Sequence, residues 1–277
     1  VQEQMSLTTD SVLKDRGGGY NKHHKEKKRE IRNSEGYVPD LEKYGMRLQG
    51  RSGCLSRFPQ NIGRIMIELY CPKDGIILDL FCGHNSRLEL CAYRCGRDYI
   101  GIDCCAEYMK ANRELVKAKE KEGSMNVIKT GKVTLIEGSS HDVDLPDNYA
   151  DFSITSPPYY SVEEYGPEKE QLGFAKTYED FLDSLYLHVV ENKRILKVGA
   201  YCVWFINDFR KDKKYHAFHI DLYNLFMKAG FEPHNIYIVD LCNTVQACFV
   251  QDILNNKVLP KQHEYILVMK KGGKECK

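Results

Sequence analysis

The sequence lacks the patterns that mark membrane proteins, secreted proteins and strongly charged partners of polyanions. Its 277 residues contain no run of about 18 apolar residues and no basic segment leading into an apolar one at the amino terminus, so we expect no membrane partner and no signal peptide. The formal net charge is +1, so any attraction for a polyanion must be local. These absences favour an ordinary globular protein.

Metal-site and disulfide spacings are missing too, although cysteine is not scarce. The chain has 11 cysteines, an odd number, with no Cys-x-x-Cys pair and no Cys/His pairs at a zinc-finger spacing. We therefore predict no metal site. The cysteines are expected to be reduced, mostly buried, small apolar residues of an intracellular protein.

What the sequence does contain is an alternation of apolar strands and amphipathic helices. Strands are predicted at 76–80, 99–103, 133–137, 151–155, 201–206, 236–241 and 264–269, and helices at 60–70, after 86, at about 106–122, 178–196 and 215–229. This alternation implies right-handed crossovers. No helical pattern separates the last two strands, so the sheet is expected to end in an antiparallel pair. We predict an α/β, Rossmann-like fold with a mostly parallel seven-stranded sheet and helices on both faces.

Two consecutive prolines lie shortly after one of these strands. Ser156-Pro157-Pro158-Tyr159 directly follows the strand 151–155, at the carboxyl end where open α/β sheets bind ligands. The prolines lack N–H groups and hold φ near about −65°, so the carbonyls of Ser156 and Pro157 point in fixed directions. Such a rigid row of acceptors, with the ring of Tyr159 beside it, suits a flat group that carries an exocyclic NH₂. The structural alternative is a Pro-Pro turn in which Tyr159 only packs.

A second element, earlier in the chain, indicates a nucleoside site. It is Asp79-Leu80-Phe81-Cys82-Gly83-His84-Asn85, in which Gly83 allows close backbone approach and Asn85 tolerates a left-handed φ. Asp103 lies 20 residues after Gly83, at the usual place for an acid that accepts from both ribose hydroxyls. The turn is not Gly-x-Gly-x-x-Gly, so a nucleoside without phosphates is favoured, and the Asp79 carboxylate is expected to meet a ligand ammonium group. These features describe S-adenosyl-L-methionine; the alternative is a plain βαβ unit.

With both elements in view, residues 56–270 resemble the DNA amino-methyltransferases, which methylate cytosine N4 or adenine N6. Ser156-Pro157-Pro158-Tyr159 matches the family's catalytic motif, and Asp79–Ser86 resembles its Asp-x-Phe-x-Gly-x-Gly loop, with His84-Asn85 in place of x-Gly. The resemblance implies a single methyltransferase domain over 36–277 that uses S-adenosylmethionine. It assigns catalysis to Ser156, Pro157, Pro158 and Tyr159, and cofactor binding to Phe58, Asp79, Phe81, Gly83, Asn85, Asp103, Cys104, Ser139 and Asp142.

Local basic segments are the candidates for binding DNA. Residues 1–35 are predicted to form a basic, flexible arm, for which a solvated tail is the alternative, and a basic turn spans 207–215. The candidate DNA-binding residues are Lys25, Lys27, Lys28, Arg29, Arg210, Lys211, Lys213 and Lys214. The stretch between the two motifs is filled by predicted elements, so a large recognition domain does not fit there. Further recognition is expected from the 161–176 loop, the 242–262 segment, a homodimer or a separate recognition partner.

Direct methyl transfer to a flipped base is the expected chemistry. Ser156 Oγ and the Pro157 carbonyl would accept the two amino hydrogens, and Tyr159 would stack on the base. No Pro-Cys dipeptide occurs, which argues against C5-methylation of cytosine. By the resemblance, serine at the first motif position favours cytosine N4. Adenine N6, an RNA or protein-amide substrate and a silent DNA-binding partner subunit stay open. A bacterial or viral enzyme would act in the cytoplasm and a eukaryotic one in the nucleus.

Overall fold

The computed structural model describes residues 12–14, 58–122, 130–160, 172–240, 255, 257–258 and 263–273. Several predictions fall outside this part of the chain. They are the remainder of the predicted arm, with Lys25, Lys27, Lys28 and Arg29, most of the 161–176 loop, and most of the 242–262 segment. The division into an arm and one domain over 36–277 stays a prediction.

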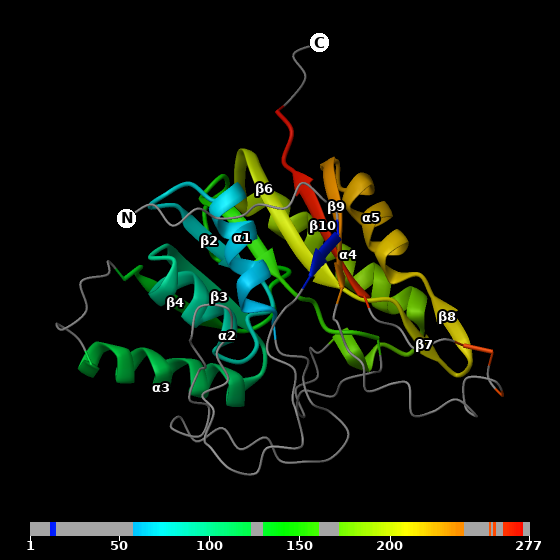
Figure 1. Ribbon diagram of the computed structural model, residues 1–277, viewed down its shortest axis with the longest axis horizontal. Helices are drawn as coiled ribbons and strands as arrows, with labels where there is room; N and C mark the ends of the chain where they lie inside the picture. The colour runs from blue at the N-terminus through cyan, green and yellow to red at the C-terminus, as the bar shows by residue number, and fades with distance from the viewer. Residues whose placement is uncertain are drawn as a thin grey trace.

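An eight-stranded sheet, with the order β1-β9-β10-β6-β5-β2-β3-β4, forms the centre of the molecule (Figure 1). Its strands are β1 (Val12–Lys14), β2 (Ile76–Asp79), β3 (Asp98–Asp103), β4 (Val133–Glu137), β5 (Ala150–Thr155), β6 (Leu196–Ile206), β9 (Glu232–Asp240) and β10 (His263–Lys270). All described neighbours pair in parallel except β10, which is antiparallel to both β6 and β9. The predicted antiparallel pair is therefore present, with β10 inserted between β6 and β9.

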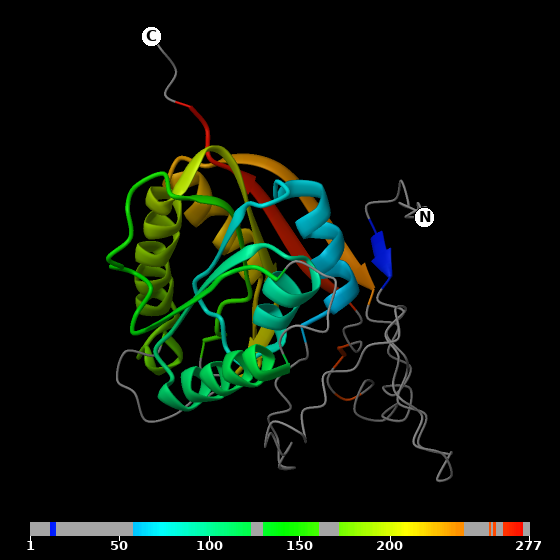
Figure 2. The same cartoon turned by 90° about the vertical axis from the view of Figure 1, so that its left-hand side faces the viewer.

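Helices cover both faces of this sheet, as predicted. α1 (Gln60–Tyr70), α2 (Ser86–Leu88), the π-helical turn η1 (Glu89–Arg94) and α3 (Ala106–Glu122) contribute to one apolar core. α4 (Tyr178–Ile195) and α5 (Phe218–Lys228) contribute to the other, together with the short 3₁₀ turn η2 (Leu172–Phe174). Figure 2 shows α1 and the α4–α5 layer on opposite sides of the strands. Alternate residues of each central strand enter opposite cores: in β6, Phe205 enters the first core and Trp204 the second.

Two features of the fold differ from the prediction. The sheet has the seven expected strands and an eighth, β1, whose three residues pair in parallel with β9. The helix expected at 215–229 begins only at Phe218, because β8 (Lys214–His216) pairs with β7 (Phe209–Lys211) in a hairpin. Asp212 and Lys213 both have positive φ (49° and 65°), as a two-residue hairpin turn requires. The basic turn predicted at 207–215 is therefore a β-hairpin.

Candidate active site

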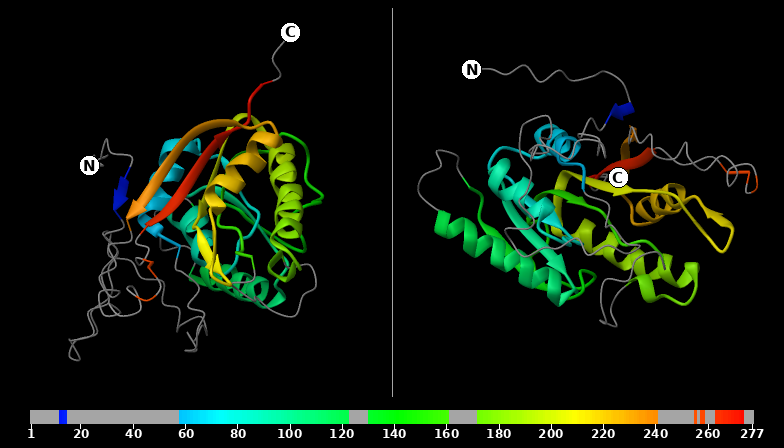
Figure 3. Two further views of the ribbon diagram at one scale, coloured as in Figure 1. Left: turned by 90° about the vertical axis from the view of Figure 1, so that its right-hand side faces the viewer. Right: turned by 60° about the horizontal axis from the view of Figure 1, so that its bottom comes forward.

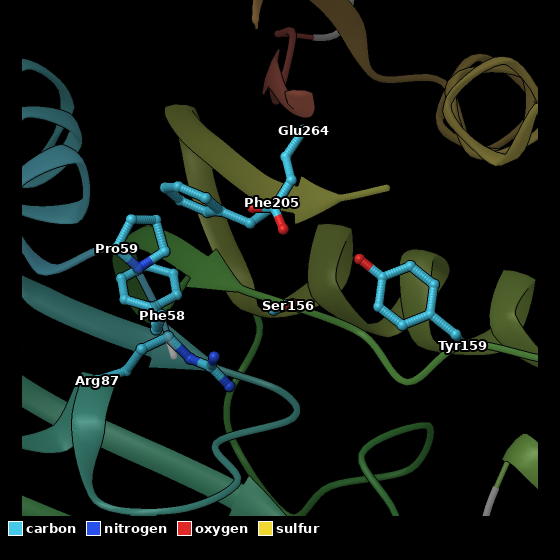
Figure 4. Close-up of a pocket in the computed structure, with 7 residues that line it drawn as sticks. All are labelled: Phe58, Pro59, Arg87, Ser156, Tyr159, Phe205 and Glu264. Atoms are coloured by element: carbon cyan, nitrogen blue, oxygen red, sulfur yellow. The ribbon is translucent and has the colours of Figure 1, made fainter. Parts of the chain in front are cut away.

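The two predicted motifs meet at one edge of the sheet. β2 and β5 are neighbours, with Ile77 opposite Phe152 and Leu78 opposite Ser153, so the turn after β2 lies beside the prolines that follow β5. The chain crosses from β2 to β3 on one side and places β5 on the other, so this is the switch point where open α/β sheets bind ligands. A pocket opens here, lined by Phe58, Pro59, Arg87, Ser156, Tyr159, Phe205 and Glu264 (Figure 4).

The turn after β2 has the backbone shape that the sequence predicted. Gly83 and Asn85 both have positive φ, 51° and 40°. The Asn85 N–H donates to Asn112 Oδ1 (2.8 Å), and Asn112 Nδ2 donates to the Gly83 carbonyl (2.7 Å). One buried side chain on α3 thus holds both ends of the turn. Asn85 therefore takes a left-handed conformation for which glycine is the usual residue.

Asp103 lies at the end of β3, with its carboxylate against this turn. Its Oδ2 accepts from the Gly83 N–H (2.8 Å) and its Oδ1 from the Cys105 N–H (2.9 Å). Burial raises the pKa of this carboxyl, and the two N–H donors only partly offset that effect. A carboxylate has about four acceptor positions, so each oxygen keeps a position for a further donor. The arrangement fits a ribose with two hydroxyls, as the sequence predicted.

Asp79 has partners that the sequence did not predict. Its side chain is fully buried and forms an ion pair with Arg87, in which Arg87 Nε lies 2.7 Å from Asp79 Oδ2. The Tyr99 hydroxyl donates to the same oxygen (2.8 Å), and Thr155 Oγ1 donates to Oδ1 (2.6 Å). The Asp79 carboxylate is thus committed to protein groups rather than presented to a ligand ammonium group. This corrects the contact predicted from the sequence.

Arg87 is a pocket residue that the sequence analysis missed. Its guanidinium lies 5.2 Å from the centroid of the Phe58 ring, and its Nη2 donates to the Phe81 carbonyl. Phe58 is brought this close by α1, where a side chain at Gly63 would clash with its ring. Burial alone lowers the pKa of Arg87, but the Asp79 carboxylate raises it above its ordinary value, so the cation is kept. An arginine near the start of a helix gives no pattern signal in the sequence.

Ser139 and Asp142, which the resemblance assigns to cofactor binding, lie on the loop after β4. Ser139 is half-buried and Asp142 is exposed. Between them, Ser140 Oγ lies 2.9 Å from Nδ1 of His188, a buried residue of α4. The ring centroids of His188 and Phe81 are 5.0 Å apart. Burial lowers the pKa of His188 to about 3, so this ring is neutral. The loop and α4 thus place apolar and neutral groups beside Phe81, which suits a flat uncharged ring. Sequence reasoning missed His188 because it lies within the helical pattern of α4.

The Ser156–Tyr159 segment follows β5 without regular secondary structure and reaches the pocket at both of its ends. Ser156 is half-buried beside the pocket and Pro157 is buried. The Tyr159 ring makes edge contacts with Phe209 (6.2 Å between centroids) and Phe218 (6.0 Å), and Figure 4 shows its hydroxyl directed into the pocket. Tyr159 is therefore held by an aromatic cluster while it faces the site.

Glu264 is the second pocket residue that the sequence analysis missed. It is near the start of β10, and because β10 runs antiparallel, this end reaches the same edge as the carboxyl ends of the parallel strands. Figure 4 shows its side chain reaching from β10 into the pocket, with the carboxylate beside Phe205. The sequence placed residue 264 at the start of a strand but did not place that strand between β6 and β9. The position therefore gave no signal.

The β7–β8 hairpin carries the basic residues predicted to bind DNA. Arg210, Lys213 and Lys214 are exposed, and Figure 3 shows the hairpin projecting beyond the end of the sheet. Lys211 Nζ lies 5.2 Å above the ring of Tyr160, which follows directly on Tyr159. This contact ties the hairpin to the Ser156–Tyr159 segment. The positive charge of the hairpin therefore lies next to the candidate active site.

The described residues give no sign of metal chemistry. No group of three or more His, Cys, Asp or Glu among them has the arrangement of a metal site. Six of the seven described cysteines are buried, as predicted, and Cys104 is half-buried; all seven are free thiols in the structure. No helix in this part of the chain is long and apolar enough to cross a membrane.

Comparison with protein families supports the carboxyl-terminal part of this site. Residues 150–276 match the N6/N4-methyltransferase family model, whose description is DNA methylase. The match begins at the first residue of β5 and includes Ser156-Pro157-Pro158-Tyr159, so the predicted resemblance is confirmed over this stretch. No curated protein matches the chain by sequence.

Solved structures show the same architecture. An S-adenosylmethionine-dependent methyltransferase from Methanosarcina mazei is 16% identical; the match covers 75% of this chain and 97% of that one, with a TM-score of 0.52. A protein assigned as a methyltransferase from Bacillus halodurans C-125 is 10% identical over 77% and 100% of the two chains, with a TM-score of 0.50. A Thermus thermophilus protein assigned as a DNA modification methylase is 26% identical over 50% and 54%, with a TM-score of 0.37. The first two confirm the predicted Rossmann-like methyltransferase fold.

Proposed function

On the premise that residues 150–276 belong to the DNA methylase family, we propose that this protein is an S-adenosylmethionine-dependent DNA methyltransferase that acts on an exocyclic amino group. The observation that carries the proposal is the position of Ser156-Pro157-Pro158-Tyr159. This segment lies at the switch point of the sheet, beside a turn whose residues fit a nucleoside. The preferred target is cytosine N4, and adenine N6 is the second choice.

The residues around the β2 turn fit the cofactor. Asp103 keeps acceptor positions for ribose hydroxyls, and Gly83 leaves the turn open to close approach. Phe81 and the neutral His188 suit the adenine ring, with Ser139 and Asp142 on the loop beside it. Phe58 would flank the methionine part, and Asn85 in the turn and Cys104 directly after β3 are further candidates for contact with the cofactor. When bound, S-adenosylmethionine supplies a methyl group on a positively charged sulfur.

The Ser156–Tyr159 segment would prepare the amino group for attack. The amine of a base is a poor nucleophile because its lone pair is delocalised into the ring. Ser156 Oγ and the Pro157 carbonyl accept its two hydrogens, which favours a pyramidal nitrogen with its lone pair directed at the methyl carbon. Tyr159 holds the flipped base, so positioning and fixed dipoles carry the catalysis.

Glu264 would complete this chemistry by removing a proton. The amino nitrogen loses one proton when it gains a methyl group, and that proton needs an acceptor in the pocket. Glu264 supplies the carboxylate among the seven lining residues. The serine hydroxyl at the motif is neutral at ordinary pH, so the carboxylate from β10 is the better acceptor. Glu264→Gln should therefore slow turnover while leaving cofactor binding intact.

The basic hairpin would hold the DNA backbone next to this pocket. Arg210, Lys213 and Lys214 are exposed on β7 and β8, and phosphate contacts from such residues position DNA without reading its sequence. The arm with Lys25, Lys27, Lys28 and Arg29 would add to this attraction. A homodimer or a separate recognition partner would supply whatever sequence reading the chain itself does not.

Mass spectrometry of nucleosides tests the proposed function. Plasmid DNA is incubated with the protein and S-adenosylmethionine, then digested and analysed. N4-methylcytosine is the expected product. N6-methyladenine would keep the reaction class and overturn the preference for cytosine. Parallel assays offer RNA and a peptide amide. If the cofactor binds, DNA gives neither product and one of these is methylated, that molecule rather than DNA is the substrate.

A further inference from the structure

We infer that Arg87 binds the carboxylate of the cofactor's methionine part, and that Asp79 is the positioning residue that holds Arg87 in place. The inference rests on the proposed function, because it deepens the cofactor site of that function. It also replaces the role first expected of Asp79. The ligand group met at this point would be an anion bound by an arginine rather than an ammonium group bound by an aspartate.

The guanidinium lies where the methionine part of the cofactor would have to pass. Arg87 lines the pocket together with Phe58, Pro59 and Ser156. Its Nη2 lies 3.9 Å from the position that a side chain on Gly83 would occupy. Arg87 is therefore between the turn that receives the nucleoside and the segment that receives the target base (Figure 4). The sulfur of the cofactor would lie where these two regions meet, and the amino-acid part extends from that sulfur, within reach of a side chain placed there.

The orientation of the guanidinium leaves donors for a ligand. Nε is taken by Asp79 Oδ2 (2.7 Å) and one hydrogen of Nη2 by the Phe81 carbonyl. Among the described residues, none accepts a hydrogen bond from Nη1, which leaves both its hydrogens and one on Nη2 for a ligand. Nη1 and Nη2 form the planar edge that binds a carboxylate through two parallel hydrogen bonds. Asp79 is fully buried and holds the opposite edge, so the guanidinium cannot turn without breaking a buried pair.

Because Arg87 is buried, its charge attracts an anionic ligand group more strongly than the charge of an exposed arginine would. The Arg87 side chain is only 9% exposed, so little water screens its charge. Asp79 balances that charge, but its oxygens are also occupied by Tyr99 and Thr155, which draws its negative charge away from the pocket side. The exposed edge of the pair is therefore electropositive. The alternative is that Arg87 only supports the β2 turn. In that case, removing the carboxylate from the ligand would not change its affinity.

A comparison of three ligands separates these two readings. The full chain is titrated calorimetrically with S-adenosylmethionine, with decarboxylated S-adenosylmethionine, and with 5′-methylthioadenosine, which lacks the amino-acid part. Hydrogen bonds between charged groups predict that the wild type binds S-adenosylmethionine about 10- to 100-fold more tightly than its decarboxylated form. The affinity for 5′-methylthioadenosine serves as the internal standard for an intact nucleoside site.

The matched variant removes both charges of the buried pair together. Asp79→Asn/Arg87→Gln leaves no lone charge in the interior, so it is expected to fold where Arg87→Gln alone would be strained. In the double variant the preference for the carboxylate should fall to about threefold or less, with unchanged affinity for 5′-methylthioadenosine. Arg87→Lys keeps the charge but loses the planar edge, and should give an intermediate preference.

Two results would overturn the inference, and they differ from failure of the proposed function. If the wild type binds S-adenosylmethionine but does not prefer it over the decarboxylated form, Arg87 does not bind the carboxylate. The same holds if the double variant keeps the full preference. If the wild type binds neither S-adenosylmethionine nor 5′-methylthioadenosine, the proposed function itself fails, and the inference fails with it.

Discussion

Two parts of the site are built in different ways: the turn after β2 with its neighbours, which is the proposed cofactor half, and Ser156–Tyr159 with its neighbours, which is the proposed target half. Around the β2 turn, polar groups are buried and bonded to one another: Asp79 to Arg87, Tyr99 and Thr155, and Asp103 to two backbone N–H groups. Around Ser156–Tyr159 the Tyr159 ring packs against the rings of Phe209 and Phe218, and the polar contacts nearby, such as Tyr215 and His219 donating to Asp208, lie in the hairpin and α5 rather than in the segment. The described contacts of the first half are therefore mainly buried polar ones, and those of the Tyr159 ring in the second half are mainly aromatic packing.

This difference fits what each half would do under the proposed function. A cofactor of constant shape is best met by donors and acceptors fixed in advance, whereas a base that leaves a duplex would need a pocket it can enter. The family match follows the same division, because residues 150–276 include the target half and do not include the β2 turn. In that turn Asn85 is held by Asn112, and Arg87 by Asp79. Ser156–Tyr159 can thus be recognised from the sequence, whereas the side chains that hold the β2 turn are recognised only from their contacts in the structure.

The largest expected effect comes from breaking the buried pair of the cofactor half. Arg87→Gln leaves Asp79 as a lone buried carboxylate, so the free energy of unfolding should fall by about 3–5 kcal/mol. Asp79→Asn/Arg87→Gln should recover most of that loss. Denaturant titration followed through the fluorescence of Trp204, the single tryptophan and fully buried, measures both.

An exposed ion pair on the same face provides the control. Arg113 and Glu137 lie 2.8 Å apart, but their side chains are 45% and 42% exposed. Arg113→Gln should therefore cost about 1 kcal/mol or less. Equal losses for Arg87→Gln and Arg113→Gln would show that the cofactor half is not held together by its buried charges.

The next effect concerns the reaction in the target half. Ser156→Ala removes one acceptor for the amino hydrogens, so the single-turnover rate of methylation should fall by about 100-fold, while the cofactor dissociation constant stays within about twofold. Rapid-quench methylation and calorimetry give the two values. Ser184→Ala, at a half-buried serine of α4, should change neither. A parallel loss of rate and cofactor affinity would mean that the two halves are not separate.

The sequence predicted the positions of the elements and the two motifs better than it predicted the side-chain contacts of the site. Strand and helix positions came from apolar periodicity. They differ from the structure where pairing overrides periodicity, as in β7–β8, and where strands begin earlier than the pattern, as β6 and β9 do. They also miss β1, whose three residues are too few for a pattern. The position of the Pro-Pro segment was predicted because it follows a recognisable strand. The turn at Gly83 and Asn85 was predicted because positive φ restricts residue type.

The side chains missed by the sequence analysis share one physical cause. Arg87, His188 and Glu264 each lie within a regular element, where periodicity says which face is buried but not which distant residue is met. The partner of Arg87 is Asp79, that of His188 is Ser140, and Glu264 reaches the pocket only because β10 is inserted beside β6. Each contact depends on tertiary packing, which a local pattern does not contain.

A pH series tests the adenine side of the proposed cofactor half at His188. Burial lowers its pKa to about 3, below the usual value near 6.5, so the unfolded chain binds a proton that the folded protein excludes. His188 therefore destabilises the fold as the pH falls below about 6.5 and has no such effect above it. Between pH 7 and pH 5 the wild type should lose about 2 kcal/mol that His188→Asn does not lose.

Denaturant titrations at both pH values measure this difference. His234→Asn replaces an exposed histidine and should behave like the wild type. If His188→Asn shows the same pH dependence as the wild type, the His188 ring is accessible to water. The adenine side of the cofactor half would then be less closed than its contacts with Ser140 and Phe81 indicate.

The smallest effect should come from the basic hairpin, at the outer limit of the target half. Lys213→Ala/Lys214→Ala removes two exposed charges next to the pocket. Removing one phosphate contact lowers the slope of log affinity against log salt by about 0.9, so the slope should fall by about 1–2, with a several-fold weaker affinity at moderate salt. Fluorescence anisotropy with a labelled duplex over a salt series measures both.

Two exposed lysines of α3, on the cofactor half, make the matched comparison. Lys110→Ala/Lys117→Ala removes the same charge from the chain but lies away from the hairpin. If only the hairpin variant changes the slope, DNA is held by the half that carries the reaction motif. Equal changes in both variants would mean that attraction to DNA is spread over the surface, because the loss would then depend on net charge rather than on place.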